Sequence, residues 1–274
     1  MQKFCRGVEY AICTMAAVVM LLFGIAVPAL ALDGAASPSA SPLPSTAAIV
    51  QNLMAANARR AAALRGYQSK RIYDLEYTGF FGGHAEMQVE ATYRAPNDKS
   101  FKVISESGSK LLLREVLMKL LQSEREAQEE RNRKALEIGP ANYSFELENV
   151  QHTPTGDLYV LAVEPRSKSK FVYNGKIWVD ARDYAITRME GSPATNPSFW
   201  VKNVEVQYEW AKIGGFWLPA RNYSVTNVRL GGRAVLNIGY SDYQITASQA
   251  ATAKSAEKNP VLPDPASVTM QPHF

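Results

Sequence analysis

The strongest constraint in this sequence is a repeated alternation of apolar and polar residues, broken at short intervals by turn-forming residues. Apolar side chains occupy every second position in 87–93, 143–147 and 204–210, which is the period of a β-strand with one buried face. The turns expected between such strands are Gly82-Gly83, Pro96-Asn97-Asp98, Pro154 to Asp157, Asn174-Gly175, Gly214-Gly215 and Gly231-Gly232. This spacing predicts consecutive hairpins, about ten antiparallel strands in meander order.

Two segments have a helical period instead. In the first, Ile49, Leu53, Ala56 and Leu64 recur at helical spacing, with Ser45 as N-cap and Gly66 as the expected C-terminal stop. The second, Ser109 to Glu137, follows the third expected strand; its first half, KLLLREVLMKLL, is apolar on most of its circumference, and SEREAQEERNRK after it is charged throughout. The pattern favours a mainly β protein with helices, in which a strongly curved sheet or incomplete barrel wraps against them. A flat sandwich is the alternative, but it would leave the inserted apolar helix without a place to be buried.

The first 31 residues have the features of a cleavable secretory signal. Lys3 and Arg6 precede an apolar stretch from Ala11 to Val27, and Ala29-Leu30-Ala31 offers the small residues after which a signal peptidase cuts. An uncleaved anchor is the alternative, but the apolar stretch is short for a spanning helix of roughly 20 residues. We therefore expect an exported protein that has lost residues 1–31.

Both cysteines, Cys5 and Cys13, lie inside this signal. The mature chain is then expected to have no disulfide and no cysteine that could carry a lipid, and so no stable membrane anchor. Removal of Lys3, Arg6 and Glu9 changes the formal charge from +4 to +3. This small excess is spread along the chain, which argues against nucleic acid as a partner.

Composition divides the rest of the chain into three parts. Residues 32–44 are rich in Ala, Ser and Pro and are expected to be a flexible linker, and residues 248–274 are expected to be a disordered tail. Residues 45–247 are long enough for one domain with a sizeable core.

Metal and cofactor chemistry find little support in the sequence. The three histidines, His84, His152 and His273, lie in three unrelated segments, each expected to be a loop or tail. A shared metal site would require all three to converge, so exposed loop histidines are the favoured interpretation. We expect no metal and no cofactor.

Catalytic motifs are equally weak. The S-x-x-K pattern occurs at Ser107–Lys110 and Ser167–Lys170, but its partner motifs are missing, so a helix start and a solvated loop are the favoured interpretations. Asp180 and Asp183 flank an expected turn, where carboxylates typically bond backbone N–H groups. No catalytic residue is assigned, and we expect a protein that is not an enzyme.

The inserted helix is the one feature that exceeds ordinary expectation. Its eight large apolar residues are more than one sheet face usually covers. Either it is a core helix packed on two layers, or it is a lid over an apolar cavity inside a curved sheet. The residues expected to contact an acyl chain under the lid hypothesis are Leu112, Val116, Leu117, Leu120, Leu121, Val89, Tyr93, Phe101, Val204, Val206, Tyr208 and Trp210. The basic loop Arg166 to Lys170 is expected to be solvated, although it has the charge to meet an anionic head group.

Several segments together resemble the outer-membrane lipoprotein-sorting group, the superfamily of the periplasmic lipoprotein carrier LolA. They are KFVYNGKIWVDARDYAITRMEG (170–191), NPSFWVKNVEVQYEW (196–210), GGFWLPARNYSVTNVRLGG (214–232) and LNIGYSDYQ (236–244). The WVD step before a turn and a strand ending in Arg, and FWLP opening a later strand, carry the resemblance. It extends from the first helix to about Thr246.

The resemblance implies an unclosed antiparallel β-barrel, capped by an N-terminal helix and an inserted apolar helix, that holds acyl chains of lipoproteins or lipids. A periplasmic carrier of this type would be a monomer working between inner-membrane release and outer-membrane acceptor proteins. It is also expected to use a basic residue near the entrance, for which Arg65, Arg71 and Arg94 are all candidates. The alternative is a periplasmic sensor or envelope scaffold that binds a protein partner through helix 111–121.

Overall fold

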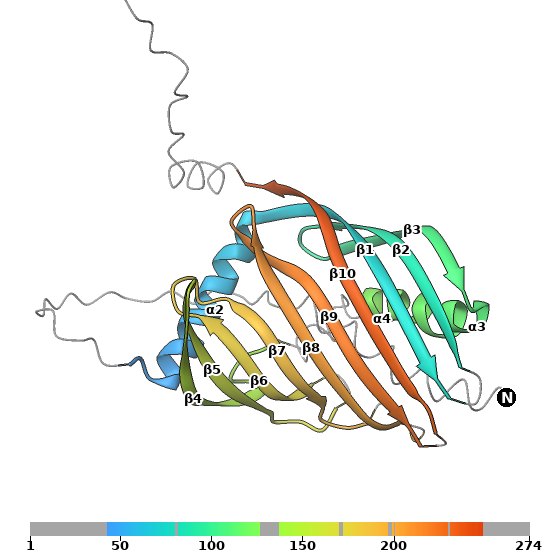
Figure 1. Ribbon diagram of the computed structural model, residues 1–274. Coiled ribbons are helices and arrows are strands. Elements are labelled where there is room, and N and C mark those ends of the chain that lie inside the picture. The colour runs from blue at the N-terminus through green and yellow to red at the C-terminus, as the bar shows by residue number, and fades with distance from the viewer. Residues whose placement is uncertain are drawn as a thin grey trace, which may run out of the picture.

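The computed structural model describes residues 43–79, 82–126, 137–169, 172–196, 199, 201–229 and 231–248. Within these ranges the chain forms one antiparallel sheet of ten strands with a set of helices on one side of it (Figure 1). The strands are β1 Leu64–Thr78, β2 Gly83–Arg94, β3 Asp98–Gly108, β4 Tyr143–Thr153, β5 Gly156–Pro165, β6 Tyr173–Asp180, β7 Ile186–Pro193, β8 Val201–Ile213, β9 Phe216–Val228 and β10 Arg233–Ala247. The helices are α2 Thr46–Ala63, α3 Lys110–Leu112, the π-helical turn η2 Leu113–Leu117, and α4 Met118–Glu126.

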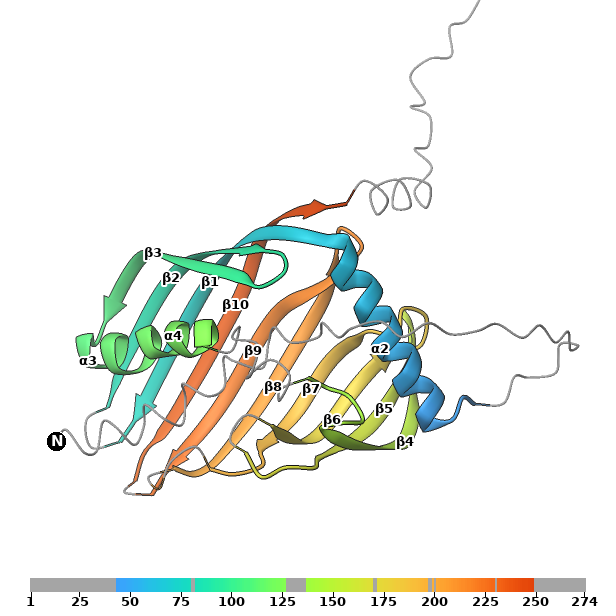
Figure 2. The ribbon, with the colours of Figure 1, turned by 180° about the vertical axis from the view of Figure 1, so that it is seen from behind.

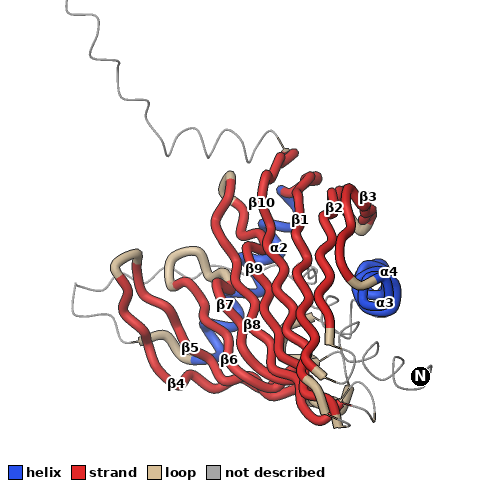
Figure 3. The backbone as a smooth tube through the Cα atoms, turned by 45° about the vertical axis from the view of Figure 1, so that its right-hand side comes forward, coloured by secondary structure: helices blue, strands red, loops and turns tan. Residues whose placement is uncertain are grey.

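The strand order is β3-β2-β1-β10-β9-β8-β7-β6-β5-β4. Every neighbouring pair in this order is consecutive in sequence except β1 with β10, which pair, for example, Arg71 with Tyr240 and Thr78 with Arg233. Among the described residues β3 and β4 form the two edges and do not pair with each other, so the sheet is curved but unclosed (Figure 3). The expected unclosed antiparallel barrel is therefore confirmed.

The period-two pattern determines which face of each strand is buried. In β1, every second residue from Ser69 to Tyr77 is buried, and the residues between them are exposed. The strands β2 and β8 alternate in the same way, and their buried apolar residues share one core with residues of both helices. Figure 2 shows both helices on one side of the sheet. We call this side the inner face.

One expected turn is wrong. Asn174-Gly175 lies inside β6, and the chain turns after it, where the Asp180 carboxylate accepts hydrogen bonds from the backbone N–H of Arg182 at 3.0 Å and of Asp183 at 2.7 Å. The glycine suits a strand interior here because β7 approaches very closely. A Cβ atom at Gly175 would lie 1.9 Å from the carbonyl oxygen of Glu190.

Helix α2 begins as expected and ends earlier than expected. The Ser45 side chain accepts a hydrogen bond from the Ala48 N–H at 3.2 Å and so caps the first turn. The helix ends at Ala63, and Leu64 already belongs to β1, so Gly66 is not its stop. Gly66 instead allows β2 to approach, since a Cβ atom there would lie 2.6 Å from the Tyr93 carbonyl oxygen.

Polar contacts hold both ends of α2 against the sheet. Arg60 donates hydrogen bonds to the backbone oxygens of Asp183 at 2.8 Å and Tyr184 at 2.9 Å, in the turn between β6 and β7. At its other end the Thr46 hydroxyl accepts from the Leu147 N–H at 3.3 Å in β4. The helix thus crosses the inner face obliquely toward the β4 edge (Figure 2).

The second helical segment directly follows β3, as expected. Ser109 caps it, because its hydroxyl accepts from the Leu112 N–H at 3.4 Å and its own N–H donates to the His84 carbonyl at 2.8 Å. The segment is helical to Glu126 and lies over β1–β3 (Figure 2). The rest of the expected helix, the signal peptide and most of the expected linker and tail lie outside the described residues.

Candidate functional site

The inserted helix buries one continuous apolar face against the inner face of the sheet. Six of its eight large apolar residues are buried in the main core: Leu112, Leu113, Val116, Leu117, Leu120 and Leu121. The other two, Leu111 and Met118, are 40% and 41% exposed. The apolar residues of the helix are therefore less completely buried than the sequence suggested. Leu111 and Met118 are seven residues apart, close to two helical turns, and so lie on the same, solvent-facing side.

Most of the expected acyl-contact residues of the strands join this same core. Val89 of β2 and Val204, Val206, Tyr208 and Trp210 of β8 are buried in it, and Phe101 of β3 packs against it partly buried. Together with the helix residues they form one apolar surface that extends across the inner face. Binding of an acyl chain to this surface stays a prediction.

Tyr93 is the exception among the expected contact residues. It lies at the end of β2 in a separate, smaller cluster with Leu64, Tyr67, Phe216 and Leu218. Its ring centroid is 5.4 Å from that of Tyr67, and its hydroxyl donates to the Pro96 carbonyl oxygen at 2.9 Å. The structure therefore does not bring Tyr93 together with the other eleven residues.

A cluster of three charged side chains lies between the inserted helix and the sheet. Arg71 of β1, Lys99 of β3 and Glu124 of α4 have side chains that are 0%, 0% and 2% exposed. Arg71 Nη1 donates to both carboxylate oxygens of Glu124, at 3.0 and 2.9 Å, and to the Tyr73 hydroxyl at 3.4 Å. Lys99 Nζ forms a short contact with Glu124 Oε1. We call these three residues the buried ion cluster.

Aromatic rings complete the surroundings of the buried ion cluster. The Arg71 guanidinium lies 5.3 Å from the centroid of the Phe101 ring and 5.0 Å from that of Tyr240. Phe101 belongs to β3 and Tyr240 to β10, which lie on opposite sides of β1 in the sheet. Lys99 Nζ is also 5.3 Å from the Phe101 centroid. Such contacts stabilise a cation that has been removed from water.

Burial and mutual attraction act in opposite directions on these groups. Burial, helped by the Arg71 charge, lowers the pKa of Lys99 to about 7, although Glu124 opposes the change. Burial would raise the pKa of Glu124, but the two cations outweigh it and hold that pKa below its usual value. For Arg71, burial opposes the charge, yet Glu124 and the neighbouring tyrosines keep its pKa raised. The carboxylate of Glu124 is therefore the group that holds the cluster together.

Sequence reasoning found only part of this cluster. Arg71 was one of three candidate basic residues, and the other two, Arg65 and Arg94, are exposed. Glu124 belongs to the half of the helix that the sequence marks only as charged, and its burial is not predicted there. Its position gives the missing signal, because it lies four residues after Leu120 and so continues the buried stripe of the helix. Lys99 carried a similar signal, two residues before Phe101 on the same strand face.

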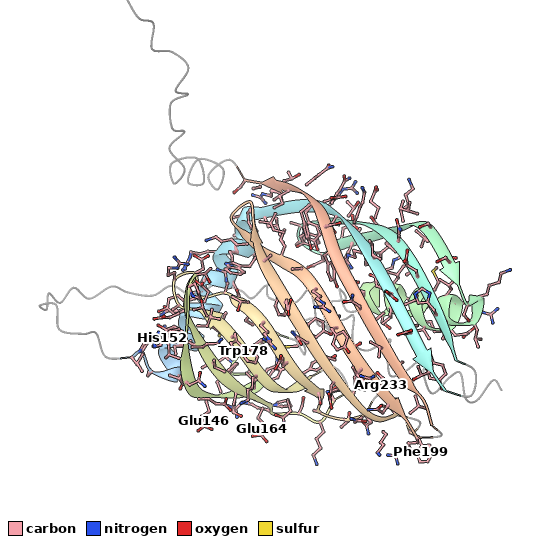
Figure 4. The ribbon with its side chains drawn as sticks, viewed as in Figure 1. Glu146, His152, Glu164, Trp178, Phe199 and Arg233 are labelled. Atoms are coloured by element: carbon pink, nitrogen blue, oxygen red, sulfur yellow. The ribbon has the colours of Figure 1, made fainter. Side chains whose placement is uncertain are left out.

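The remaining candidates have structural roles. His84 and His152 are exposed as expected, but the prediction that they lie in loops is wrong, since His84 belongs to β2 and His152 to edge strand β4 (Figure 4). Their rings contact Asp74 at 3.0 Å and Asp157 at 2.8 Å, respectively. Asp180 bonds the backbone of its turn, as expected. Asp183 instead accepts from Trp217 Nε1 at 2.9 Å and pairs with Lys212.

The basic loop is described only up to Ser169, and the third histidine is not described. Arg166 donates to the Pro140 carbonyl oxygen at 2.8 Å on the surface, whereas Lys170 and His273 lie outside the described residues. Within the described ranges no three metal-ligating side chains come together. In the same part of the chain, no helix has the length and apolarity needed to span a membrane.

Comparison with known proteins finds likeness in structure rather than in sequence. No family model and no curated protein matches the chain. Among solved structures, it is similar to a domain described as an outer membrane lipoprotein-sorting protein from Vibrio parahaemolyticus, at 12% identity, covering 77% of this chain and 97% of that one, with a TM-score of 0.39. It is also similar to a LolA superfamily protein from Nitrosomonas europaea, at 11% identity, covering 76% and 96%, with a TM-score of 0.37.

A third similar structure is the MucA/MucB complex of Pseudomonas aeruginosa, at 10% identity, covering 76% of this chain and 96% of that one, with a TM-score of 0.25. These similar structures include members of the group that the sequence resembles.

Proposed function

We propose that this protein is a non-enzymatic periplasmic carrier that binds acyl chains of lipoproteins or lipids and moves them toward the outer membrane. The observation that supports it most is the apolar surface shared by helix 110–121 and the inner face of an unclosed sheet. An acyl chain can enter between the unclosed sheet and a helix when that helix is displaced, because no strand pairing has to break.

The energetics of this surface favour an elongated apolar ligand. Each methylene moved from water to such a surface contributes on the order of 0.8 kcal/mol. A long acyl chain therefore needs few polar contacts to be held at useful affinity. The sequence resemblance also supports cargo that passes between membranes.

Lipid extraction tests this proposal directly. The purified protein is extracted and analysed by lipid mass spectrometry, and in parallel a fluorescent fatty probe is titrated and displaced. We expect acyl species in the extract and saturable probe binding. Absence of both would refute the carrier.

A pair of substitutions locates the binding surface. Val206→Phe enlarges a buried side chain on the inner face of β8, and Val225→Phe makes the same change on the opposite face of β9. The first should weaken probe binding several-fold while the second leaves it unchanged. Circular dichroism confirms that both variants are folded. Equal effects of the two changes would place the ligand elsewhere.

A second candidate function is binding of a protein partner through the inserted helix, as a sensor or scaffold would. It is supported by Leu111 and Met118, which are exposed two helical turns apart on the side away from the sheet. Leu111→Glu combined with Met118→Glu separates the two functions. A partner-binding protein loses its co-purifying partner, whereas a carrier keeps its probe affinity.

A further inference from the structure

The Arg71 guanidinium has hydrogen-bonding capacity that the described part of the protein leaves unused. All hydrogen bonds that the guanidinium makes there are donated by its Nη1 atom, to the Glu124 carboxylate and to the Tyr73 hydroxyl. Its Nε and Nη2 atoms are buried and have no hydrogen-bond partner there. Among the described residues, three N–H groups of this fully buried cation, two of them on its Nε/Nη2 edge, therefore have no acceptor.

Such an arrangement is costly unless something else satisfies it. A buried N–H without an acceptor costs about 1–3 kcal/mol, and more for a charged group. The buried ion cluster also has two cations and one carboxylate, so it carries one positive charge in excess when all three groups are ionised. Buried charges in proteins are normally neutralised by a partner.

The geometry of the unused edge specifies what can neutralise it. The Nε and Nη2 atoms form the fork of a guanidinium that binds both oxygens of a planar carboxylate in two parallel hydrogen bonds. The rings of Phe101 and Tyr240 lie on either side of the guanidinium. The Val89 side chain, opposite Arg71 on β2, belongs to the apolar surface described above. An anion at this fork would thus be continuous with an apolar chain.

We propose that the Nε/Nη2 edge of Arg71 binds the carboxylate of a long-chain fatty acid whose hydrocarbon chain lies on the inner face. The inference rests on the proposed acyl-binding function and adds a head-group site to it. Glu124 stays on Nη1, and the ligand supplies the second negative charge, so that the cluster and its ligand together are neutral. One singly charged head group fits this count better than a phosphate monoester, which carries about two charges near neutral pH.

The test compares ligands that differ only in the head group. Dodecanoate, its methyl ester and a lysophosphatidylglycerol of the same chain length are titrated into the purified protein at mildly acidic pH, below the Lys99 pKa of about 7, so that Lys99 is charged. Because charge-assisted hydrogen bonds contribute more than neutral ones, dodecanoate should bind at least about tenfold more tightly than the ester. Equal affinities would overturn the head-group site while leaving the carrier intact, and failure of all three to bind would overturn both. Tightest binding of the phospholipid would overturn the assignment to a carboxylate.

Variants of Arg71 test the fork itself. Arg71→Lys keeps a positive charge for Glu124 but removes the fork, so the acid should lose its advantage over the ester. Arg65→Lys, an exposed change on the same strand, is the matched control and should retain it. If Arg71→Lys does not fold, the triple variant Arg71→Met/Lys99→Met/Glu124→Leu leaves no buried charge in the cluster and should show the same loss. A preference that survives in a folded Arg71 variant would refute the site.

Discussion

Removal of the Glu124 charge should be among the most destabilising single changes in this protein. Glu124→Gln keeps the shape of the side chain but leaves Arg71 and Lys99 buried without a counter-charge. Breaking a buried ion pair from one side typically costs 3–5 kcal/mol, because the remaining charge is left unpaired. Here two cations lose their partner, although Lys99, whose pKa is already lowered to about 7, can relieve part of the cost by losing its proton. We therefore expect a loss of about 3 kcal/mol or more in the free energy of unfolding.

Replacement of the whole cluster should have the opposite effect. In the triple variant Arg71→Met/Lys99→Met/Glu124→Leu no buried charge remains, and apolar side chains of similar volume fill the space. Such replacements are commonly neutral or stabilising by about 1–4 kcal/mol. A protein that is made more stable by losing three charged residues would be retaining them for binding rather than for folding.

Urea denaturation followed by tryptophan fluorescence measures both changes. Linear extrapolation gives the free energy of unfolding, and an unchanged slope shows that the surface exposed on unfolding is the same in each variant. The reasoning fails if Glu124→Gln costs less than about 1 kcal/mol. It fails equally if the triple variant is as unstable as the single one.

Three further predictions follow from single features. Because folding lowers the pKa of Lys99 from 10.5 to about 7, the folded state binds fewer protons than the unfolded state between these two pH values. The free energy of unfolding, measured in urea titrations, should therefore rise with pH over this range, by at most about 1.4 kcal/mol per pH unit. This dependence on pH should vanish in Lys99→Met. The double variant Gly83→Cys/Ser109→Cys should form a disulfide, since the two Cβ positions are 3.6 Å apart. Both forms of this variant lack the Ser109 helix cap, and the oxidised form should be about 2 kcal/mol more stable than the reduced form. Equal stability of the two forms would contradict this prediction. Gly175→Ala should destabilise strongly or prevent folding, because its Cβ would lie 1.9 Å from the Glu190 carbonyl oxygen, whereas Gly215→Ala, with open space around it and only a positive φ to oppose it, should cost about 1 kcal/mol by the same urea assay.

The fold was accessible from the sequence because it follows from local patterns. The period of two identified the buried face of strands such as β2 and β8, and Ser45 marked the start of a helix through its side-chain chemistry. The failures were at glycines. Asn174-Gly175 has the composition of a hairpin turn, but the need for a residue without Cβ arose from the approach of β7, a contact between segments that local pattern does not contain.

The candidate site was only half accessible for the same reason. The apolar face of the inserted helix could be predicted from its spacing, but the partner of Arg71 could not, because residues 71, 99 and 124 come from three elements far apart in sequence. Glu124 follows the helical stripe of Leu120 and Leu121, yet a charged residue there normally marks the solvent side. Its burial became evident only when both cations were placed opposite it.

The pairing of β1 with β10 has a consequence for how the chain acquires its structure. Thr78 and Arg233, which are hydrogen-bonded across this pair, are separated by 155 residues in sequence. The β1–β10 pair therefore cannot form until almost the whole domain has been delivered, and contacts of such long range make folding slow. If the chain is exported as its first 31 residues predict, this delay keeps the sheet incomplete while the last strand is still in transit.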